Sequence, residues 1–234
     1  MIYQSSRPAY QALKRKIIDG DMPFGAPITV KRLEAEIGFS AIPIREALIA
    51  LAAEDLIDFF PGRGFFNKRL EVEGLGLRLD LLQHLLLACA TALPSSRRPI
   101  LRKRLFQDAS KLRSVSESAF EYVSLTSDIF DTYFAHPIAI LTRTAIAQCA
   151  RYLLIDEQRH EADGSLAKAA FSYLWQVSSS GPVSVAEGLR AFFDVRKVRI
   201  GETIEAAKQR DLLSGPSIFS SAAFDSATTR TTEI

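Results

Sequence analysis

The chain has 234 residues, of which 47% are hydrophobic and 24% are charged, and its formal net charge is +2 at pH 7. That length predicts one large or two small domains, and the composition is ordinary for a soluble globular protein. No uninterrupted apolar run reaches the ~18 residues that a membrane span requires. The first twenty residues carry four basic side chains without a continuous apolar core, which argues against a signal peptide.

Cysteines and sequence motifs narrow the function classes further. Cys89 and Cys149 lie in apolar helical stretches, where buried free thiols in a reducing cytosol are expected. The chain has no G-x-x-x-x-G-K-[ST], no G-x-G-x-x-G after a strand and no G-x-S-x-G. We therefore expect a cytoplasmic protein that is not an enzyme, holds no cofactor and does not bind a membrane.

The N-terminal region predicts a helix-turn-helix. A first amphipathic helix is expected over residues 6–18, followed by a proline- and glycine-rich loop over residues 21–27. Two further helices meet at Gly38-Phe39-Ser40. Gly38 suits the left-handed residue that ends a helix, and Ser40 suits the N-cap of the next one.

The second helix of this pair has one buried and one open face. Ile44, Leu48 and Leu51 repeat at spacings of four and three, which predicts a core stripe. Pro43 falls in the first turn, where no intrahelical N–H is required. The residues off the stripe are those that an inserted helix presents to a DNA groove: Ser40, Ala41, Ile42, Arg45 and Ile49.

A β-hairpin is predicted next. Ile57, Phe59 and Phe65 alternate with more polar neighbours around the turn Pro61-Gly62-Arg63-Gly64, which gives the hairpin a basic tip. The order helix, tight turn, helix and hairpin is the layout of a winged helix-turn-helix DNA-binding module.

The rest of the chain has a helical period throughout. Residues 70–76 carry two glycines and are interpreted as a linker, and residues 214–234 as a Ser/Thr-rich tail. Helices are expected at roughly 77–93, 99–113, 115–136, 138–158, 164–178 and 183–212. The predicted fold is mainly α, with a winged helix-turn-helix over residues 1–69 and an all-α bundle of six or seven helices over residues 77–213.

The first third of the chain resembles the N-terminal domain of the GntR family of bacterial transcription regulators. Residues in step with that family's pattern run from the first helix to the hairpin: Ile17, Gly20, Leu33, Gly38, Ser40, Pro43, Ile44, Arg45, Glu46, Ala47, Leu48, Leu51, Glu54, Leu56, Ile57, Pro61, Gly62, Arg63, Gly64 and Phe66. The sequence departs at Ala41, where the family usually carries arginine, and at Asp55, where glycine is usual. The change at Ala41 removes one expected DNA contact.

The resemblance implies a homodimer that binds a pseudo-palindromic operator in double-stranded DNA. Arg45 is then expected to read a base edge, and Lys31 and Ser40 to hold phosphates, while the hairpin tip reaches an adjacent minor groove. The implied DNA-binding residues are Lys31, Ser40, Pro43, Arg45, Arg63 and Gly64.

The second half resembles, more weakly, the helical domain of the FadR-type branch of that family. The resemblance rests on helix number, on Arg78, on Asp128-Ile129-Phe130 and on residues 200–211. It implies a small-molecule effector, often an organic acid, bound within the bundle. Because the fork of an arginine matches the two oxygens of a carboxylate, the candidate effector-binding residues are Arg78, Arg143 and Arg196.

Many bundles of this branch hold a divalent metal through an acidic residue and three histidines. Here Asp131 stands where the histidine after Asp128 is expected, and Ile200-Gly201 stands at a second such place. The chain has three histidines, His84, His136 and His160, and their positions do not form a cluster. We therefore predict no metal site.

One alternative to DNA recognition follows from the open face of the second helix. Ala41, Ile42 and Ile49 make that face unusually apolar. This pattern also fits a winged-helix protein-interaction module without sequence-specific DNA binding. The two functions differ in salt dependence, because phosphate binding weakens steeply with salt and apolar contact does not.

Overall fold

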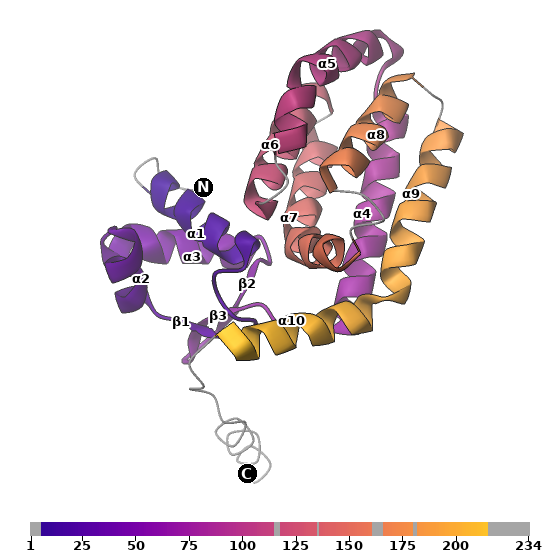
Figure 1. The fold of residues 1–234 in the computed structure, drawn as a ribbon. Coiled ribbons are helices and arrows are strands. Elements are labelled where there is room, and N and C mark those ends of the chain that lie inside the picture. The colour runs from indigo at the N-terminus through magenta and orange to yellow at the C-terminus, as the bar shows by residue number, and fades with distance from the viewer. Residues whose placement is uncertain (1–5, 115–117, 135, 161–165, 180–181, 215–234) are drawn as a thin grey trace, which may run out of the picture.

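The computed structural model describes residues 6–114, 118–134, 136–160, 166–179 and 182–214. They form a small N-terminal domain and a larger helical domain beside it (Figure 1). The N-terminal domain contains α1 (Arg7–Asp19), β1 (Pro27–Ile28), α2 (Val30–Ile37), α3 (Ala41–Ala53), β2 (Ile57–Phe60) and β3 (Gly64–Asn67). The helical domain contains α4 (Val72–Ala92), the short 3-10 helix η1 (Ser95–Arg97), α5 (Arg98–Ser114), α6 (Ala119–Tyr133), α7 (His136–Arg159), α8 (Leu166–Ser179), α9 (Pro182–Val198) and α10 (Ile200–Ser214). The predicted mainly-α fold with an N-terminal winged helix-turn-helix is confirmed.

The helix-turn-helix forms as its spacing predicts. Ile44, Leu48 and Leu51 of α3 are completely buried, which confirms the core stripe. Gly38 ends α2 in the left-handed conformation at φ +73°, and its N–H donates to the carbonyl of Glu34. A side chain at this φ is strained, so glycine permits the tight turn into α3.

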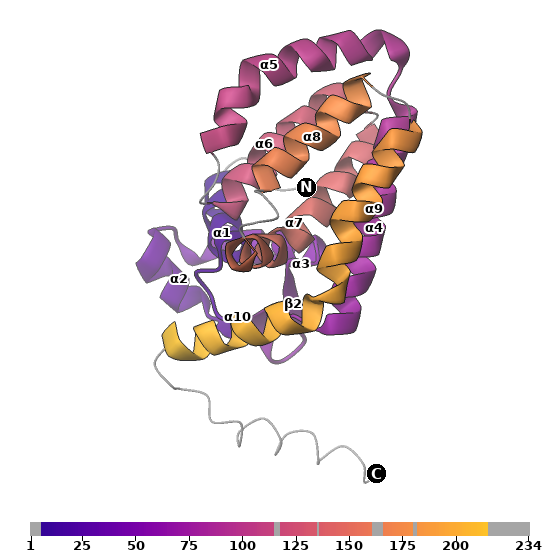
Figure 2. The same cartoon turned by 45° about the vertical axis from the view of Figure 1, so that its right-hand side comes forward.

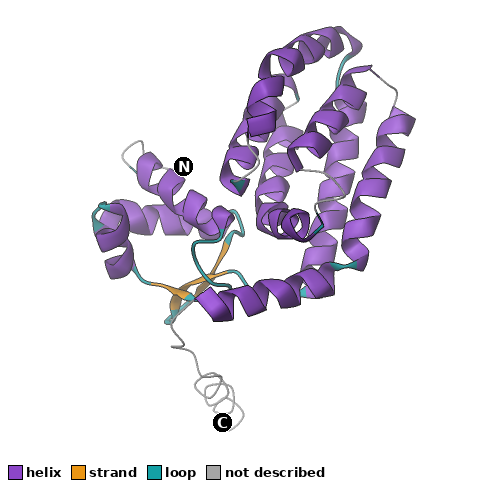
Figure 3. Cartoon of the chain, viewed as in Figure 1, coloured by secondary structure: helices purple, strands orange, loops and turns teal. Residues whose placement is uncertain are grey.

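The strands belong to the N-terminal domain, and the described part of the second domain is helical (Figure 3). The sheet is antiparallel in the order β1-β3-β2, with Phe59 opposite Phe65 and Phe60 opposite Gly64 in the wing. The sequence reading placed Pro27 in a loop and missed β1. A strand of two residues has no alternation to detect, and its pairing with β3 is a tertiary contact.

Helix α4 begins earlier than expected. The segment read as a linker over residues 70–76 contains the first turn of α4, which starts at Val72. Leu75, Leu79 and Leu82 are nearly fully buried, and this stripe holds the helix despite two glycines in its first two turns.

The long helix expected over residues 183–212 is two helices. The break falls at Arg199, and α10 then runs across the ends of α4 and α9 toward the N-terminal domain (Figures 1 and 2). Ile200 and Ile204 of α10 are buried by this packing. No proline or glycine stands at residues 197–200, so the local sequence does not predict the break.

Within the described part of the chain, two helices are long and apolar enough to cross a membrane by length and composition alone. They are α4, with a mean hydropathy of 1.2, and the 137–159 segment of α7, with 1.3. The expectation from sequence counted uninterrupted apolar runs, whereas α4 reaches this mean with Arg78 and Asp80 included. In the structure 50% of the α7 window is buried, as in a core helix, and 28% of the α4 window is buried.

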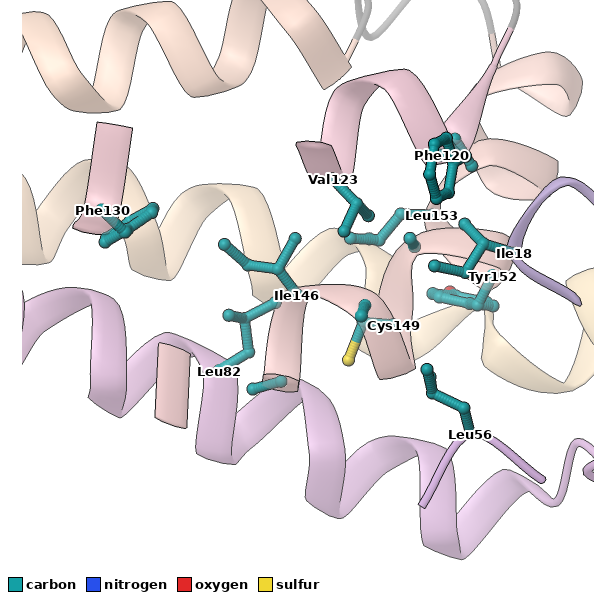
Figure 4. Packing of buried hydrophobic residues seen from close by; sticks show 14 of the residues in the cluster. Ile18, Leu56, Leu82, Phe120, Val123, Phe130, Ile146, Cys149, Tyr152 and Leu153 are labelled. Atoms are coloured by element: carbon teal, nitrogen blue, oxygen red, sulfur yellow. The ribbon is translucent and has the colours of Figure 1, made fainter. Parts of the chain in front are cut away.

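One hydrophobic core connects the two domains. Ile18 and Leu56 of the N-terminal domain lie beside Phe120, Cys149 and Tyr152 of the helical domain (Figure 4). Both cysteines are free and buried, as predicted, and burial raises the pKa of the Cys89 thiol to about 11 and that of Cys149 to about 12. These thiols are therefore protonated at neutral pH and act as small core side chains.

Candidate nucleic-acid interface

Helix α3 presents a mixed apolar and cationic face to solvent. Ile42 is 71% exposed and Ile49 is 61% exposed, and Arg45 lies exposed between them at positions i, i+3 and i+7. These spacings put the three side chains on one side of the helix, opposite the buried stripe. No described acidic side chain forms an ion pair with Arg45.

The residues around the start of α3 leave polar groups open. Ser40 occupies the N-cap position, as predicted, but its hydroxyl makes no capping hydrogen bond. Pro43 lies in the first turn and is half-buried. Lys31, in the first turn of α2, is exposed, and no described carboxylate pairs with it. The ammonium group and the hydroxyl are thus both accessible to an anionic ligand.

The tip of the wing carries one arginine above two aromatic rings. The guanidinium of Arg63 lies 5.7 Å from the ring centres of both Phe60 and Phe66. Those rings meet edge to face at 5.6 Å. Gly62 and Gly64 have φ of +75° and +94°, which the tight turn requires. The rings restrict where an otherwise flexible Arg63 side chain points.

Asp55, between α3 and β2, connects the N-terminal domain to α4. Its carboxylate pairs with Lys68 and accepts a hydrogen bond from Nη2 of Arg78 at 2.8 Å. Its backbone has φ +57°, the left-handed conformation that explains why glycine is usual at this position. In the sequence, Asp55 stood out because the family usually has glycine there. Its contacts with Lys68 and Arg78 became apparent only from the structure.

Mutation can separate two effects of Asp55, the ion pairs of its carboxylate and the strain of its left-handed backbone. Asp55→Gly loses two part-exposed ion pairs worth about 0–1 kcal/mol each and removes strain of about 1 kcal/mol, so its unfolding free energy should stay within about 1 kcal/mol of wild type. Asp55→Ala loses the same ion pairs and keeps the backbone strain, so its free energy of unfolding should be about 1–2 kcal/mol lower than that of wild type. Urea denaturation of both variants measures this order. An alanine variant at least as stable as the glycine variant would contradict it.

Other polar contacts hold the N-terminal domain against α6 and α7. The carboxylate of Asp19 accepts from the N–H of Phe120 at 2.8 Å and from the hydroxyl of Ser118 at 3.1 Å. Arg151 donates to the carbonyl of Met22 at 3.0 Å, and its guanidinium lies 3.4 Å above the ring of Phe24. The orientation of α3 relative to the helical domain is therefore fixed by several independent contacts.

The helical domain contains an apolar cavity of about 180 Å³ between α4, α6, α7, α8 and α9. Its walls include five aromatic side chains, Tyr122, Phe130, Tyr173, Phe192 and Phe193. Burial raises the pKa of Tyr122 and of Tyr173 above the ordinary value, so both phenols stay neutral. None of the residues that line the cavity is charged; the polar side chains there are hydroxyls and the amide of Gln176.

The structure does not place the three candidate effector-binding arginines on the cavity wall. Arg78 binds Asp55 at the domain junction, and Arg143 pairs with Asp131 at 2.6 Å on a part-exposed surface. Arg196 contacts a residue of the cavity wall, because its guanidinium lies 3.7 Å from the ring of Phe192, which lines the cavity. Their role toward an effector stays a prediction.

A buried acidic residue joins α7 to α9 and α10. Asp156 is completely buried and accepts from Nε and Nη2 of Arg199 at 2.6 and 2.7 Å. Nε of Arg196 lies 3.3 Å from the same carboxylate, and the hydroxyl of Thr203 donates to it at 3.4 Å. The sequence pattern does not predict this cluster, because residues 156 and 199 are far apart in the chain and come together only in the folded bundle.

The described residues contain no group of three or more His, Cys, Asp or Glu side chains arranged to hold a metal ion. Asp131 is held by Arg143, and His84 forms a local hydrogen bond with the carbonyl of Asp80 at 2.7 Å. The side chain of His136 lies outside the described part of the chain. The absence of a metal site stays a prediction for the whole protein.

Comparison with known proteins supports the assignment of the N-terminal domain. Residues 5–66 match the gntR family of bacterial regulatory proteins. Over 93 residues the chain is 31% identical to an uncharacterized HTH-type transcriptional regulator in an unstable DNA locus of Streptomyces ambofaciens. That match spans 40% of this chain and 39% of the Streptomyces protein, so it covers less than half of either.

Two solved structures resemble the fold over both domains. A putative transcriptional regulator GntR from Rhodococcus sp. RHA1 has a TM-score of 0.62 at 14% identity, covering 86% of this chain and 99% of that one. E. coli McbR/YncC has a TM-score of 0.58 at 14% identity, covering 86% and 98%. At this identity the similarity shows the fold alone. The match to the gntR family of bacterial regulatory proteins therefore covers the N-terminal domain, residues 5–66.

Proposed function

We propose that the protein is a homodimeric transcription regulator that binds DNA and responds to a small metabolite. The observation that carries this proposal is the open face of α3, the second helix of a helix-turn-helix, where Arg45 is exposed and makes no ion pair with a described residue. In this motif the second helix enters the major groove with its first residues toward the bases. The family match over residues 5–66 supports the same use of this domain.

The exposed groups divide into base-reading and phosphate-binding roles. Arg45 offers two parallel donors, which suit the O6 and N7 acceptors of guanine. Lys31 and the uncapped hydroxyl of Ser40 suit phosphate oxygens. Pro43 presets the first turn of α3, and Gly64 lets the wing backbone come close to a groove.

We expect Arg63→Ala to weaken binding to all DNA sequences about equally. We expect the guanidinium at the tip of the wing to contact phosphate groups or to sense the width of the groove. Both depend little on the identity of the bases. The salt dependence should also become shallower, with the slope of log K against log salt reduced by about one. Titrations of specific and unrelated duplexes at several salt concentrations measure both effects. Loss of binding to one sequence alone would contradict this role.

A homodimer is supported by the exposed apolar face of α4. Leu77 is 71% exposed and Leu81 is 52% exposed, and both lie on the side of α4 that turns away from the bundle core. His84 and Ala88 continue the same face at spacings of three and four. A two-fold axis beside this helix would bury the leucines of two copies against each other. Light scattering of the purified full chain tests the proposal, with a mass of two chains expected and a mass of one contradicting it.

The apolar cavity is the proposed effector site. Its aromatic walls and lack of charged lining favour a compact molecule with a mainly apolar body. A carboxylate on such a molecule would depend on Arg196, which borders the cavity through Phe192. Binding between α4, α7 and α9 would act on the same helices that hold the N-terminal domain and α10.

A DNA titration of the full chain across a salt series tests the proposed function. The probe is a duplex enriched by the protein from a randomised pool. Affinity should fall steeply and log-linearly with salt, because bound phosphates release counterions. Repeating the titration with matched neutral and acidic aromatic compounds tests the effector. No enriched duplex, or an affinity unaffected by salt, would favour a protein-interaction module instead.

A further inference from the structure

The open face of α3 carries two isoleucines that the fold does not use. Ile42 and Ile49 have the largest exposed fractions, 71% and 61%, among the large hydrophobic side chains described in the N-terminal domain. The core stripe of Ile44, Leu48 and Leu51 is complete without them, since each of those three is fully buried. Two large apolar side chains on a solvent-facing surface therefore require another explanation.

The charged side chain of Arg45 between the two isoleucines excludes a purely apolar binding partner. Arg45 lies between Ile42 and Ile49 on the same face, and no described carboxylate neutralises it. A purely apolar surface over this face would strip water from the guanidinium without replacing its hydrogen bonds, which is costly. The partner must therefore offer acceptors for Arg45 flanked by apolar groups.

The major groove of DNA offers this pattern. Guanine presents two acceptors to an arginine, and thymine presents a 5-methyl group, which is the apolar feature of the groove floor. We propose that Ile42 and Ile49 are specificity-determining residues that contact the 5-methyl groups of thymines on either side of the base read by Arg45. This inference rests on the proposed DNA-binding function.

The geometry gives the expected spacing. Seven helical residues rise by about 10 Å, and stacked bases along one strand by about 3.4 Å. The two thymine positions should therefore lie about three base pairs apart, with the base read by Arg45 between them. Ala41, where the family usually has arginine, adds no hydrogen-bond donor at the start of α3. Shape and methyl contact consequently carry more of the recognition at that end.

The test compares thymine with uracil, because deoxyuridine removes the 5-methyl group and keeps the pairing edge. The probe is the duplex enriched from a randomised pool, resynthesised with deoxyuridine at one thymine at a time. Titrations use the full-length wild type, Ile42→Ala, Ile49→Ala and the matched control Ile100→Ala. Ile100 is a 58% exposed isoleucine on α5, a helix that lies away from the N-terminal domain (Figure 1).

The expected result is a set of position-specific losses. At one thymine per half-site, replacement by deoxyuridine should weaken DNA binding by the wild-type protein about fourfold, as expected for losing one buried methyl group. At that position Ile42→Ala should bind the thymine and deoxyuridine duplexes equally, because the variant has already lost the contact. A second thymine should behave in the same way toward Ile49→Ala, and the control should match wild type at both. Equal binding of thymine and uracil duplexes by wild type, or the same loss in wild type and the alanine variants, would overturn the inference while leaving DNA binding intact. If no duplex is enriched at all, the proposed function fails and the inference with it.

Discussion

Replacing Asp156 by alanine is expected to lower the free energy of unfolding by about 3–5 kcal/mol, the range found when one partner of a buried ion pair is removed. Arg196, which is 4% exposed, and Arg199 would lose the carboxylate that both contact. The start of α10 would lose this buried attachment to α7 and keep the exposed pair between Arg159 and Glu202. Urea denaturation followed by circular dichroism measures the change.

Asp194→Ala is the matched control for this prediction. Asp194 lies on the same stretch of α9 and pairs with Lys197 at 3.6 Å, but its side chain is 59% exposed. Exposed pairs contribute about 0–1 kcal/mol, so this variant should unfold close to wild type. Equal effects of the two substitutions would show that the Asp156 cluster does not hold α10 in place.

The second large effect is expected in DNA binding. Arg45→Ala should cost about 1–3 kcal/mol of specific affinity and relax the preference at one base pair in each half-site. Its side chain is exposed and makes no ion pair with a described residue, so stability should change little. Titration with the enriched duplex and its single-base variants measures both affinity and preference.

Arg190→Ala on α9 controls for the loss of one exposed positive charge. Its effect on DNA affinity should be small, because Arg190 belongs to the helical domain. Unchanged affinity and sequence preference in Arg45→Ala would remove Arg45 from the interface. A loss equal for all sequences would instead assign it to phosphate.

Local sequence was sufficient for the helix-turn-helix and the wing of the N-terminal domain, because each of these elements carries its own signal, whereas the two-residue strand β1 has none. Gly38 marks the end of α2, the spacing of Ile44, Leu48 and Leu51 defines the inner face of α3, and the Pro-Gly-Arg-Gly turn defines the wing. In these places propensity, capping and hydrophobic period agree, so the tertiary structure follows the local preference.

Contacts between residues far apart in the chain could not be predicted from the sequence. At the break between α9 and α10, Arg199 donates to Asp156, 43 residues away, and nothing in the local pattern marks the break. Asp55 was noticed as a departure from glycine, but its pairing with Arg78 follows only from how the two domains pack. The three candidate arginines all lie in apolar helical patterns, but their environments differ, and of the three Arg196 is the one that contacts a residue of the cavity wall, Phe192. Residue type alone did not distinguish them.

The most direct measurement for the central claim is selection of DNA by the full-length protein from a randomised duplex pool. A homodimer that presents α3 to the major groove predicts one enriched sequence with two inverted half-sites. Their centres should be separated by about 10 base pairs or a multiple of that spacing. Two protomers should bind each duplex. A pool that stays random after repeated rounds of selection would contradict sequence-specific recognition by α3.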